Sequence, residues 1–152
     1  MGETLELLLP ISGTVVPLSE VNDYLFSKKM MGEGAAIIPN DNCIYSPIDG
    51  EVVVLYESKH AIIIKGKSGI KLLIHIGMDT AKLEGRGFGS FVKLGDKVLS
   101  GDKLIFFDTE YVEDKSSLET PIVITNPEII ENIQIDFGAK KAKIKFATIT
   151  FK

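Results

Sequence analysis

The chain has 152 residues, a formal net charge of −4 and 45% hydrophobic residues, which is enough for one domain with its own core, and we expect a single domain over residues 1–152. Acidic and basic residues are interspersed, so no basic face points to a nucleic-acid partner. No apolar run is long enough to span a membrane, and the amino-terminal segment lacks the basic region of a signal peptide. We therefore expect a soluble, cytoplasmic protein without direct membrane insertion.

The single cysteine, Cys43, excludes an internal disulfide, and its turn-like context predicts an ordinary surface or edge residue.

Short strands separated by turns are predicted along most of the chain. Besides turn-then-strand segments at 10–16 and 47–53, the expected strands are 35–38, 50–56, 61–64, 72–76, 91–93, 103–108, 122–125, 143–147 and 148–151. Short helical turns are expected within 19–31, within 108–115 and from 128 to 132. This pattern predicts an all-β fold, an antiparallel β-sandwich or barrel-like single domain with a few short helical turns.

Both histidines of the chain lie in the segment 60–80, which reads as a β-hairpin. If the turn is the two residues Lys67 and Ser68, His60 lies directly opposite His75 on one face of the sheet. Directly opposed residues have Cβ atoms about 5 Å apart, so the two imidazoles would touch. A shift of one residue would place them on opposite faces, so this contact depends on the register.

Two adjacent imidazoles have three interpretations, which the residues alone leave open. One ring nitrogen can act as a nucleophile while the other histidine hydrogen-bonds the group that is attached. The pair can also supply two ligands of a zinc site that takes a third ligand from elsewhere. In the third interpretation both histidines are structural.

Other motifs are weaker. The run at 85–89 is rich in glycine but lacks the ending of a phosphate-binding loop, so it predicts a flexible loop. The segments SPIDGEVV and FVKLGDKVLSGDKLIFF are similar to biotinyl and lipoyl carrier domains, but Lys67 lacks the flanking residues of their modified lysine. Spacing alone favours a core position for Phe26, Met30 and Met31. The residues alone likewise favour a turn-capping role for Asp79 and Thr80, which follow Gly77.

The segment HAIIIKGKSGIKLLIHIGMDT resembles the active-site signature of the glucose-type enzyme IIA of the bacterial phosphoenolpyruvate-dependent sugar phosphotransferase system. The likeness covers nearly the whole chain and includes PISGTVVPLSEVNDYLFSKKMMGEGAAIIP, SPIDGEVV, EGRGFGSFVKLGDKVLSGDKLIFFD and LETPIVITNPE. The resemblance implies a β-sandwich phosphotransferase without a cofactor or resident metal. Such a protein receives a phosphoryl group from HPr and passes it to a cysteine on the IIB domain of a sugar permease. The alternatives are a regulatory, phosphoryl-accepting module of a sugar transporter and a two-histidine metal-binding protein.

The resemblance also implies roles for individual residues. His75 matches the phosphorylated histidine, which reacts through Nε2 while a carbonyl near Gly77 holds the Nδ1 proton. His60 matches the second histidine, which hydrogen-bonds the phosphoryl group, and Ser58 is expected to orient it. Asp79 and Thr80 complete the signature.

The expected partner surface also follows from the resemblance. Phe26, Met30, Met31, Tyr56 and Leu73 fall where relatives have apolar residues ringing the histidines, which reverses the core expectation for the first three. The positions expected to meet arginines of HPr or IIB are Asp23, Asp79 and Glu128. Lys71 and Lys82 stand where enteric relatives often have acids, a difference that bears on partner specificity.

Overall fold

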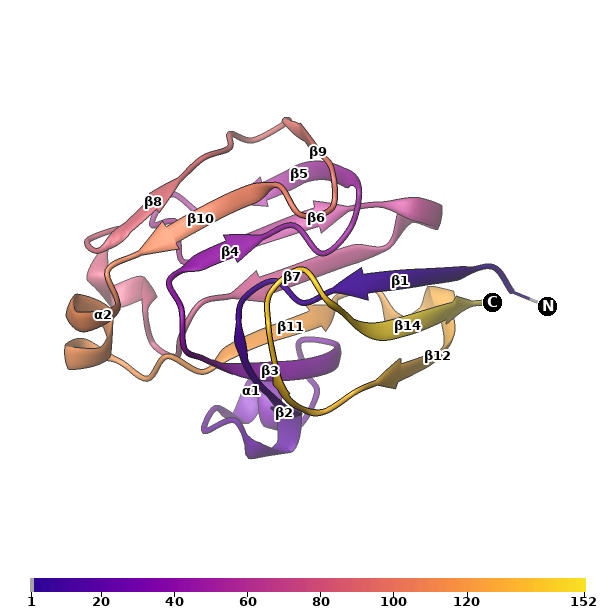
Figure 1. Cartoon of the computed structure of the whole chain (residues 1–152), viewed down its shortest axis with the longest axis horizontal. Helices are drawn as coiled ribbons and strands as arrows, with labels where there is room; N and C mark the ends of the chain where they lie inside the picture. The colour runs from indigo at the N-terminus through magenta and orange to yellow at the C-terminus, as the bar shows by residue number, and fades with distance from the viewer. Residues whose placement is uncertain (1) are drawn as a thin grey trace.

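The computed structural model describes residues 2–152 and consists mainly of three antiparallel β-sheets (Figure 1). The largest has the strand order β13 (Gly138–Lys140), β2 (Gly13–Pro17), β3 (Glu33–Pro39), β11 (Thr120–Ile124), β7 (Lys71–His75), β6 (Ala61–Lys65), β5 (Gly50–Leu55) and β9 (Lys97–Val98). One small sheet is ordered β1 (Thr4–Leu8), β14 (Lys145–Phe151) and β12 (Ile130–Ile135), and the other β4 (Cys43–Tyr45), β10 (Lys103–Phe107) and β8 (Phe88–Ser90). The predicted all-β antiparallel class is confirmed.

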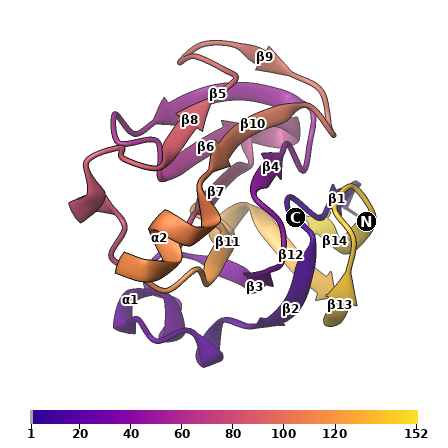
Figure 2. The ribbon, with the colours of Figure 1, turned by 60° about the vertical axis from the view of Figure 1, so that its left-hand side comes forward.

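Within the described residues 2–152, helical structure is limited to short pieces. The two α-helices are α1 (Tyr24–Ser27) and α2 (Thr109–Lys115), and the 3₁₀ turns are η1 (Leu18–Glu20), η2 (Lys67–Gly69), η3 (Ala81–Leu83) and η4 (Pro127–Ile129). Figure 2 shows α1 and α2 on the same side of the molecule. Within residues 2–152, no helix has the length and apolar character needed to cross a membrane.

Strand alternation gives the large sheet two buried faces. In β7, Leu72 and Ile74 belong to the main core, which the small sheets complete with residues such as Phe146. The intervening Leu73 lies on the other face of the sheet. There the segment that carries η1 and α1 covers it, and it is buried in one cluster with residues such as Phe26. Burying a leucine or phenylalanine side chain stabilises the fold by about 1.5–3 kcal/mol. The contacts of Leu73 and Phe26 therefore stabilise the packing of the η1–α1 segment against the sheet. By the same alternation, His75 at the end of β7 lies on the outer face, beside α1.

Several predicted elements are confirmed and others are wrong. The helix expected within 108–115 forms as α2, with the Asp108 side chain capping it by accepting a hydrogen bond from the Tyr111 amide at 3.1 Å. The helix expected from 128 to 132 stops at η4, because residues from Ile130 onward pair with β14 as strand β12. The strand expected at 91–93 lies three residues earlier, as β8. Cys43 is half-buried on β4, an edge strand of its small sheet, as expected.

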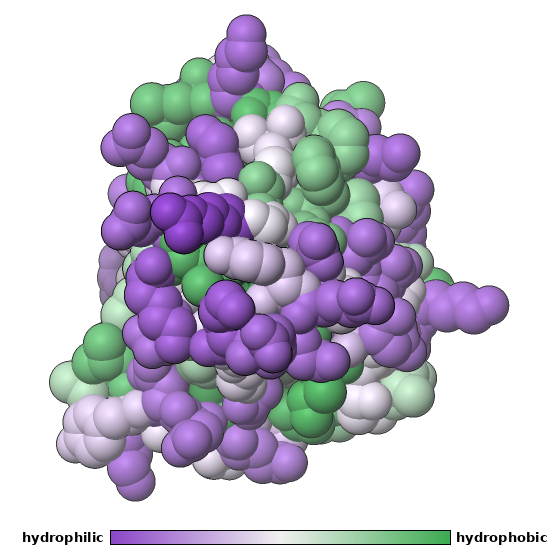
Figure 3. Space-filling view, turned by 90° about the vertical axis from the view of Figure 1, so that its left-hand side faces the viewer, coloured by the Kyte–Doolittle hydropathy of each residue, from purple (hydrophilic) through white to green (hydrophobic). Residues whose placement is uncertain are grey.

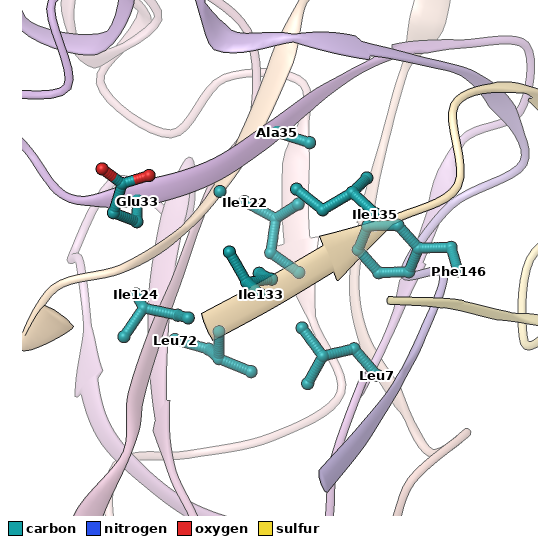
Figure 4. A pocket seen from close by; sticks show the side chains of 10 residues that line it. Leu7, Glu33, Ala35, Leu72, Ile122, Ile124, Ile133, Ile135 and Phe146 are labelled. Carbon is teal, nitrogen blue, oxygen red and sulfur yellow. The ribbon is translucent and has the colours of Figure 1, made fainter. Parts of the chain in front are cut away.

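The core contains one small apolar cavity (Figure 4). Side chains from the large sheet and the β1–β14–β12 sheet converge on it, including Leu7, Ile122, Ile133 and Phe146. Its volume of about 10 Å³ leaves room for one water molecule at most, and its walls offer no cluster of polar partners. It is therefore a packing gap and not a ligand site.

Candidate functional site

The turn between β6 and β7 sets the register of the histidine hairpin. It contains three residues, Lys67–Gly69, and the Gly66 amide closes it by donating to the Ile70 carbonyl at 2.9 Å. Gly69 has a φ of 81°, which glycine adopts without a steric penalty, so it joins the turn instead of the strand. As a result His75 pairs with Ala61. The predicted two-residue turn, and with it the direct pairing of His60 and His75, is wrong by one residue.

The two imidazoles nevertheless meet. Their ring centroids are 5.0 Å apart and their planes lie at 80°. His60 lies in the loop 57–60, which follows β5 and which the Tyr56 amide closes by donating to the Ala61 carbonyl at 3.1 Å. Because His60 precedes β6, its side chain is not bound to the alternation of that strand. The predicted contact is confirmed, although the predicted register that suggested it is not.

A backbone carbonyl fixes the tautomer of His75. Its Nδ1 lies 2.8 Å from the Gly77 carbonyl oxygen, which can only accept, so Nδ1 carries the proton and Nε2 keeps a free lone pair. Gly77 has a φ of 72°, and a Cβ added there would lie 2.6 Å from the Ser117 carbonyl oxygen. The close approach of the 117 backbone therefore requires glycine at this position. The Phe26 ring also packs against the imidazole, with ring centroids 5.4 Å apart.

His60 is the more deeply buried histidine, with 3% of its surface exposed. The Ser58 hydroxyl lies 2.5 Å from its Nδ1, and the Tyr56 ring meets it edge-on with centroids 5.1 Å apart. Burial, and then the neighbouring charge of His75, lower the pKa of His60 to about 4. Burial also lowers the pKa of His75, while its hydrogen bond to Gly77 and the charge of Asp23 oppose that change. Both rings are therefore neutral at neutral pH.

The turn that follows Gly77 is held by a local bond and by a bond to a segment distant in the sequence. The buried Thr80 hydroxyl donates to the Ile76 carbonyl at 2.6 Å, and the Met78 amide donates to the Ser117 carbonyl at 2.9 Å. Asp79 is exposed and forms an ion pair with Lys82 at 3.1 Å. Thr80 thus supports the shape of the turn, and Asp79 lies on its surface.

The metal hypothesis gains no ligand set from the described part of the chain. Residues 2–152 contain no group of three or more histidine, cysteine or carboxylate side chains that could hold an ion. His60 and His75 would thus depend on a ligand from another molecule.

Burial corrects part of the expected partner surface. Met30 and Tyr56 are 62% and 42% exposed, as expected of that surface. Phe26 and Leu73 are only 4% and 2% exposed, because both belong to the buried cluster on the outer face of the large sheet, which also contains Leu18, Val21 and Met78. The prediction that these two side chains belong to an exposed patch is wrong, and Met31 is half-buried against the same cluster.

Two exposed residues of α1 were missed by sequence reasoning. Tyr24 and Leu25, which directly precede the buried Phe26, are 68% and 47% exposed. The signal was Asp23, whose side chain caps α1 by accepting from the Leu25 amide at 2.9 Å and so fixes which residue points inward. In Figure 3, which views the side of the molecule that carries α2, hydrophobic surface forms separate patches among hydrophilic residues.

Glu128 does not lie beside the histidines. It belongs to η4, next to the β6–β7 turn, where the Asn126 side chain donates to the Gly69 carbonyl at 2.9 Å and accepts from the Lys71 amide at 3.0 Å. Lys71 begins β7 and His75 ends it, so the two lie roughly 13 Å apart along the strand. Its expected contact with an arginine of HPr or IIB stays a prediction, for a position at the other end of β7 from His75.

Comparisons with known proteins agree with this architecture. The family model described as phosphoenolpyruvate-dependent sugar phosphotransferase system, EIIA 1, matches residues 5–130. A PTS system glucose-specific EIIA component from Bacillus cereus is 44% identical over 149 residues, which cover 96% of this chain and 90% of that protein. The solved structure of glucose permease IIA from Mycoplasma capricolum superposes with a TM-score of 0.89 at 37% identity, covering 96% of both chains.

A further relative shows that such a sequence also occurs inside a longer chain. The PTS system glucose-specific EIICBA component of Staphylococcus carnosus is 42% identical over 142 residues, which cover 90% of this chain but 21% of that protein. The family match spans most of this chain, and several relatives exceed 40% identity over most of their own length. This chain belongs to the EIIA 1 family of the phosphoenolpyruvate-dependent sugar phosphotransferase system.

Proposed function

We propose that this protein is a single-domain cytoplasmic phosphotransferase, residues 1–152, that carries a phosphoryl group on Nε2 of His75. The donor is the phosphohistidine of HPr, and the acceptor is the cysteine of a IIB domain of a sugar permease. The observation that carries the proposal is the 2.8 Å contact between His75 Nδ1 and the Gly77 carbonyl, because it leaves Nε2 as the nucleophilic nitrogen.

Acceptance is a substitution at phosphorus. The Nε2 lone pair of His75 forms a new N–P bond while the N–P bond of the donor breaks and its electron pair returns to the donor's ring nitrogen. Nδ1 keeps its proton and its bond to Gly77 throughout. In the onward step the cysteine thiolate of IIB attacks the phosphorus, and the electron pair of the N–P bond returns to Nε2. His75 thereby regains its starting tautomer.

His60 supports the phosphoryl group without accepting it. When the Ser58 hydroxyl donates to Nδ1 of His60, the ring proton resides on Nε2, which becomes a hydrogen-bond donor. With a pKa of about 4, His60 is neutral at pH 7, so it stabilises a phosphoryl oxygen by a hydrogen bond and not by a full charge.

The surface around the histidines suits brief docking to two partners in turn. Exposed apolar contacts come from Tyr56, which meets the His60 ring, and from Tyr24, Leu25 and Met30, which lie on or just after the helix whose Phe26 contacts His75. Asp23 adds a carboxylate near His75, which suits a cationic side chain of HPr or IIB. An apolar centre with a charged rim is typical of interfaces that form and separate quickly.

The test is phosphoryl transfer from phosphoenolpyruvate through enzyme I and HPr to native protein, His75→Gln and His60→Gln. Native protein and His60→Gln should accept one acid-labile phosphoryl group, and His75→Gln should accept none. Phosphorylated His60→Gln should then pass its group to IIB more slowly than native protein does. The proposal fails if native protein stays unlabelled while enzyme I and HPr are active on another acceptor.

A further inference from the structure

The two acids that flank the phosphoryl-accepting histidine differ in how they are paired. Asp23 lies close enough to His75 to influence its pKa, and it caps α1. Among residues 2–152, no lysine or arginine nitrogen lies within ion-pair distance of its carboxylate. Asp79, two residues beyond Gly77, has its carboxylate 3.1 Å from the Lys82 ammonium. Within the described residues, Asp23 is thus available to a cation of another molecule, whereas Asp79 is already paired with Lys82.

Local structure holds the Asp79–Lys82 pair together. Asp79 has a φ of 59°, a conformation that aspartate tolerates better than most residues, and its carbonyl accepts a hydrogen bond from the Ser116 hydroxyl at 3.4 Å. Lys82 follows three residues later in η3. Because both partners sit on one short turn, their pairing orders little additional chain. Their side chains are 77% and 48% exposed, so the pair lies at the surface, in the segment that follows His75.

We infer that Lys82 is a specificity-determining residue, which occupies Asp79 and directs the cationic side chain of a docking partner to Asp23 instead. This inference rests on the proposed function, because it assumes that the partner is the phosphoryl donor. A partner's cation can take Asp79 only by displacing Lys82 from an exposed ion pair. Such pairs are weak, so Lys82 tunes the affinity and does not block docking.

Removal of Lys82 should therefore strengthen binding to a cationic donor by a modest factor. An exposed ion pair corresponds to about a two- to fivefold change in an equilibrium constant, and we expect Lys82→Gln to raise the affinity for HPr by that factor at low salt. The gain should shrink at high salt, where exposed charges are screened. It should also vanish in an Asp79→Asn background, because no carboxylate remains to be uncovered.

The matched control is Lys145→Gln. Lys145 pairs with Glu6 at 3.7 Å, its side chain is 49% exposed, and it lies on β14 in a different sheet, so its replacement changes the net charge equally. The affinity of HPr for native protein, Lys82→Gln, Lys145→Gln, Asp79→Asn and Lys82→Gln/Asp79→Asn should be measured by titration calorimetry at low and high salt. The rate of phosphoryl transfer to His75 is recorded on the same samples.

The outcomes separate this inference from the proposed function. A gain confined to Lys82→Gln and abolished by Asp79→Asn supports the inference. Equal effects of Lys82→Gln and Lys145→Gln overturn it, because net charge alone would then explain the change. Weaker binding of Lys82→Gln also overturns it, because Lys82 would then contact the partner itself. If native protein accepts no phosphoryl group, the proposed function fails and the inference fails with it, whereas normal transfer with an unchanged affinity in Lys82→Gln overturns the inference alone.

Discussion

The buried His60 makes the stability of the fold depend on pH in a predictable direction. In the unfolded chain His60 titrates near 6.5, whereas burial and the charge of His75 lower its pKa to about 4 in the folded protein. The unfolded state therefore binds more protons between these two values. The stabilisation is fully present above pH 6.5 and is lost as the pH falls towards 4.

The size of this effect follows from the difference between the two pKa values. Each pKa unit corresponds to about 1.4 kcal/mol, so protonation of His60 costs about 3 kcal/mol of folding free energy once the pH is below 4. Between pH 7 and pH 5 the same linkage amounts to about 2 kcal/mol. The carboxylates of the protein add their own pH dependence, so only a comparison with a variant isolates this contribution.

The comparison is between native protein and His60→Gln, which keeps a polar side chain beside Ser58 but cannot titrate. Urea unfolding at pH 7, 6 and 5 should give native protein a loss of stability that exceeds the variant's loss by about 1–2 kcal/mol. Since the chain has only two histidines, imidazole proton resonances provide a direct readout, and that of His60 should titrate near pH 4. Parallel stability curves for the two proteins, or a His60 midpoint near 6.5, would refute the argument.

Two further variants test the contacts that hold the rings. Gly77→Ala places a Cβ 2.6 Å from the Ser117 carbonyl oxygen and should lower the free energy of unfolding by about 2–4 kcal/mol, whereas Gly95→Ala, with positive φ but open space, should lose only about 1 kcal/mol. Equal losses in urea unfolding would contradict the steric argument. Ser58→Ala should slow transfer from phosphorylated His75 to IIB more than acceptance from HPr, and Ser58→Thr should restore the rate. Native rates in Ser58→Ala, measured by rapid quench, would exclude an orienting role for the hydroxyl.

The fold class was predictable because it depends on many short, regular signals, whereas some individual elements were not. The apolar run of β7 faces a core on both sides, so it remains a strand in any register. The segment that begins at Asn126 carries a genuine helix-start signal, and one turn does form there as η4. Pairing with β14 and packing of Ile133 and Ile135 against the core then favour a strand. Those long-range contacts leave little trace in the local sequence.

Predictions of the site failed where they depended on a single residue. Gly66 to Gly69 suits a turn of two residues or of three, and nothing within the segment decides whether Gly69 belongs to the strand or to the turn. The position of Phe26 depends on where α1 begins, because a four-residue helix can bury only a small part of its surface. The distance of Glu128 from His75 could not be predicted, because it depends on the order of the strands.

The histidine pair owes its asymmetry to the two groups that hold it. Each ring is held at Nδ1 by a residue two positions away, Ser58 before His60 and Gly77 after His75. A backbone carbonyl can only accept a hydrogen bond, so it forces the Nδ1–H tautomer and leaves a lone pair on Nε2 of His75. A hydroxyl can donate, so it permits the opposite tautomer and a proton on Nε2 of His60. The proposed function uses these two tautomers of one side-chain type as a nucleophile and a hydrogen-bond donor, and neither role requires a charge on the ring.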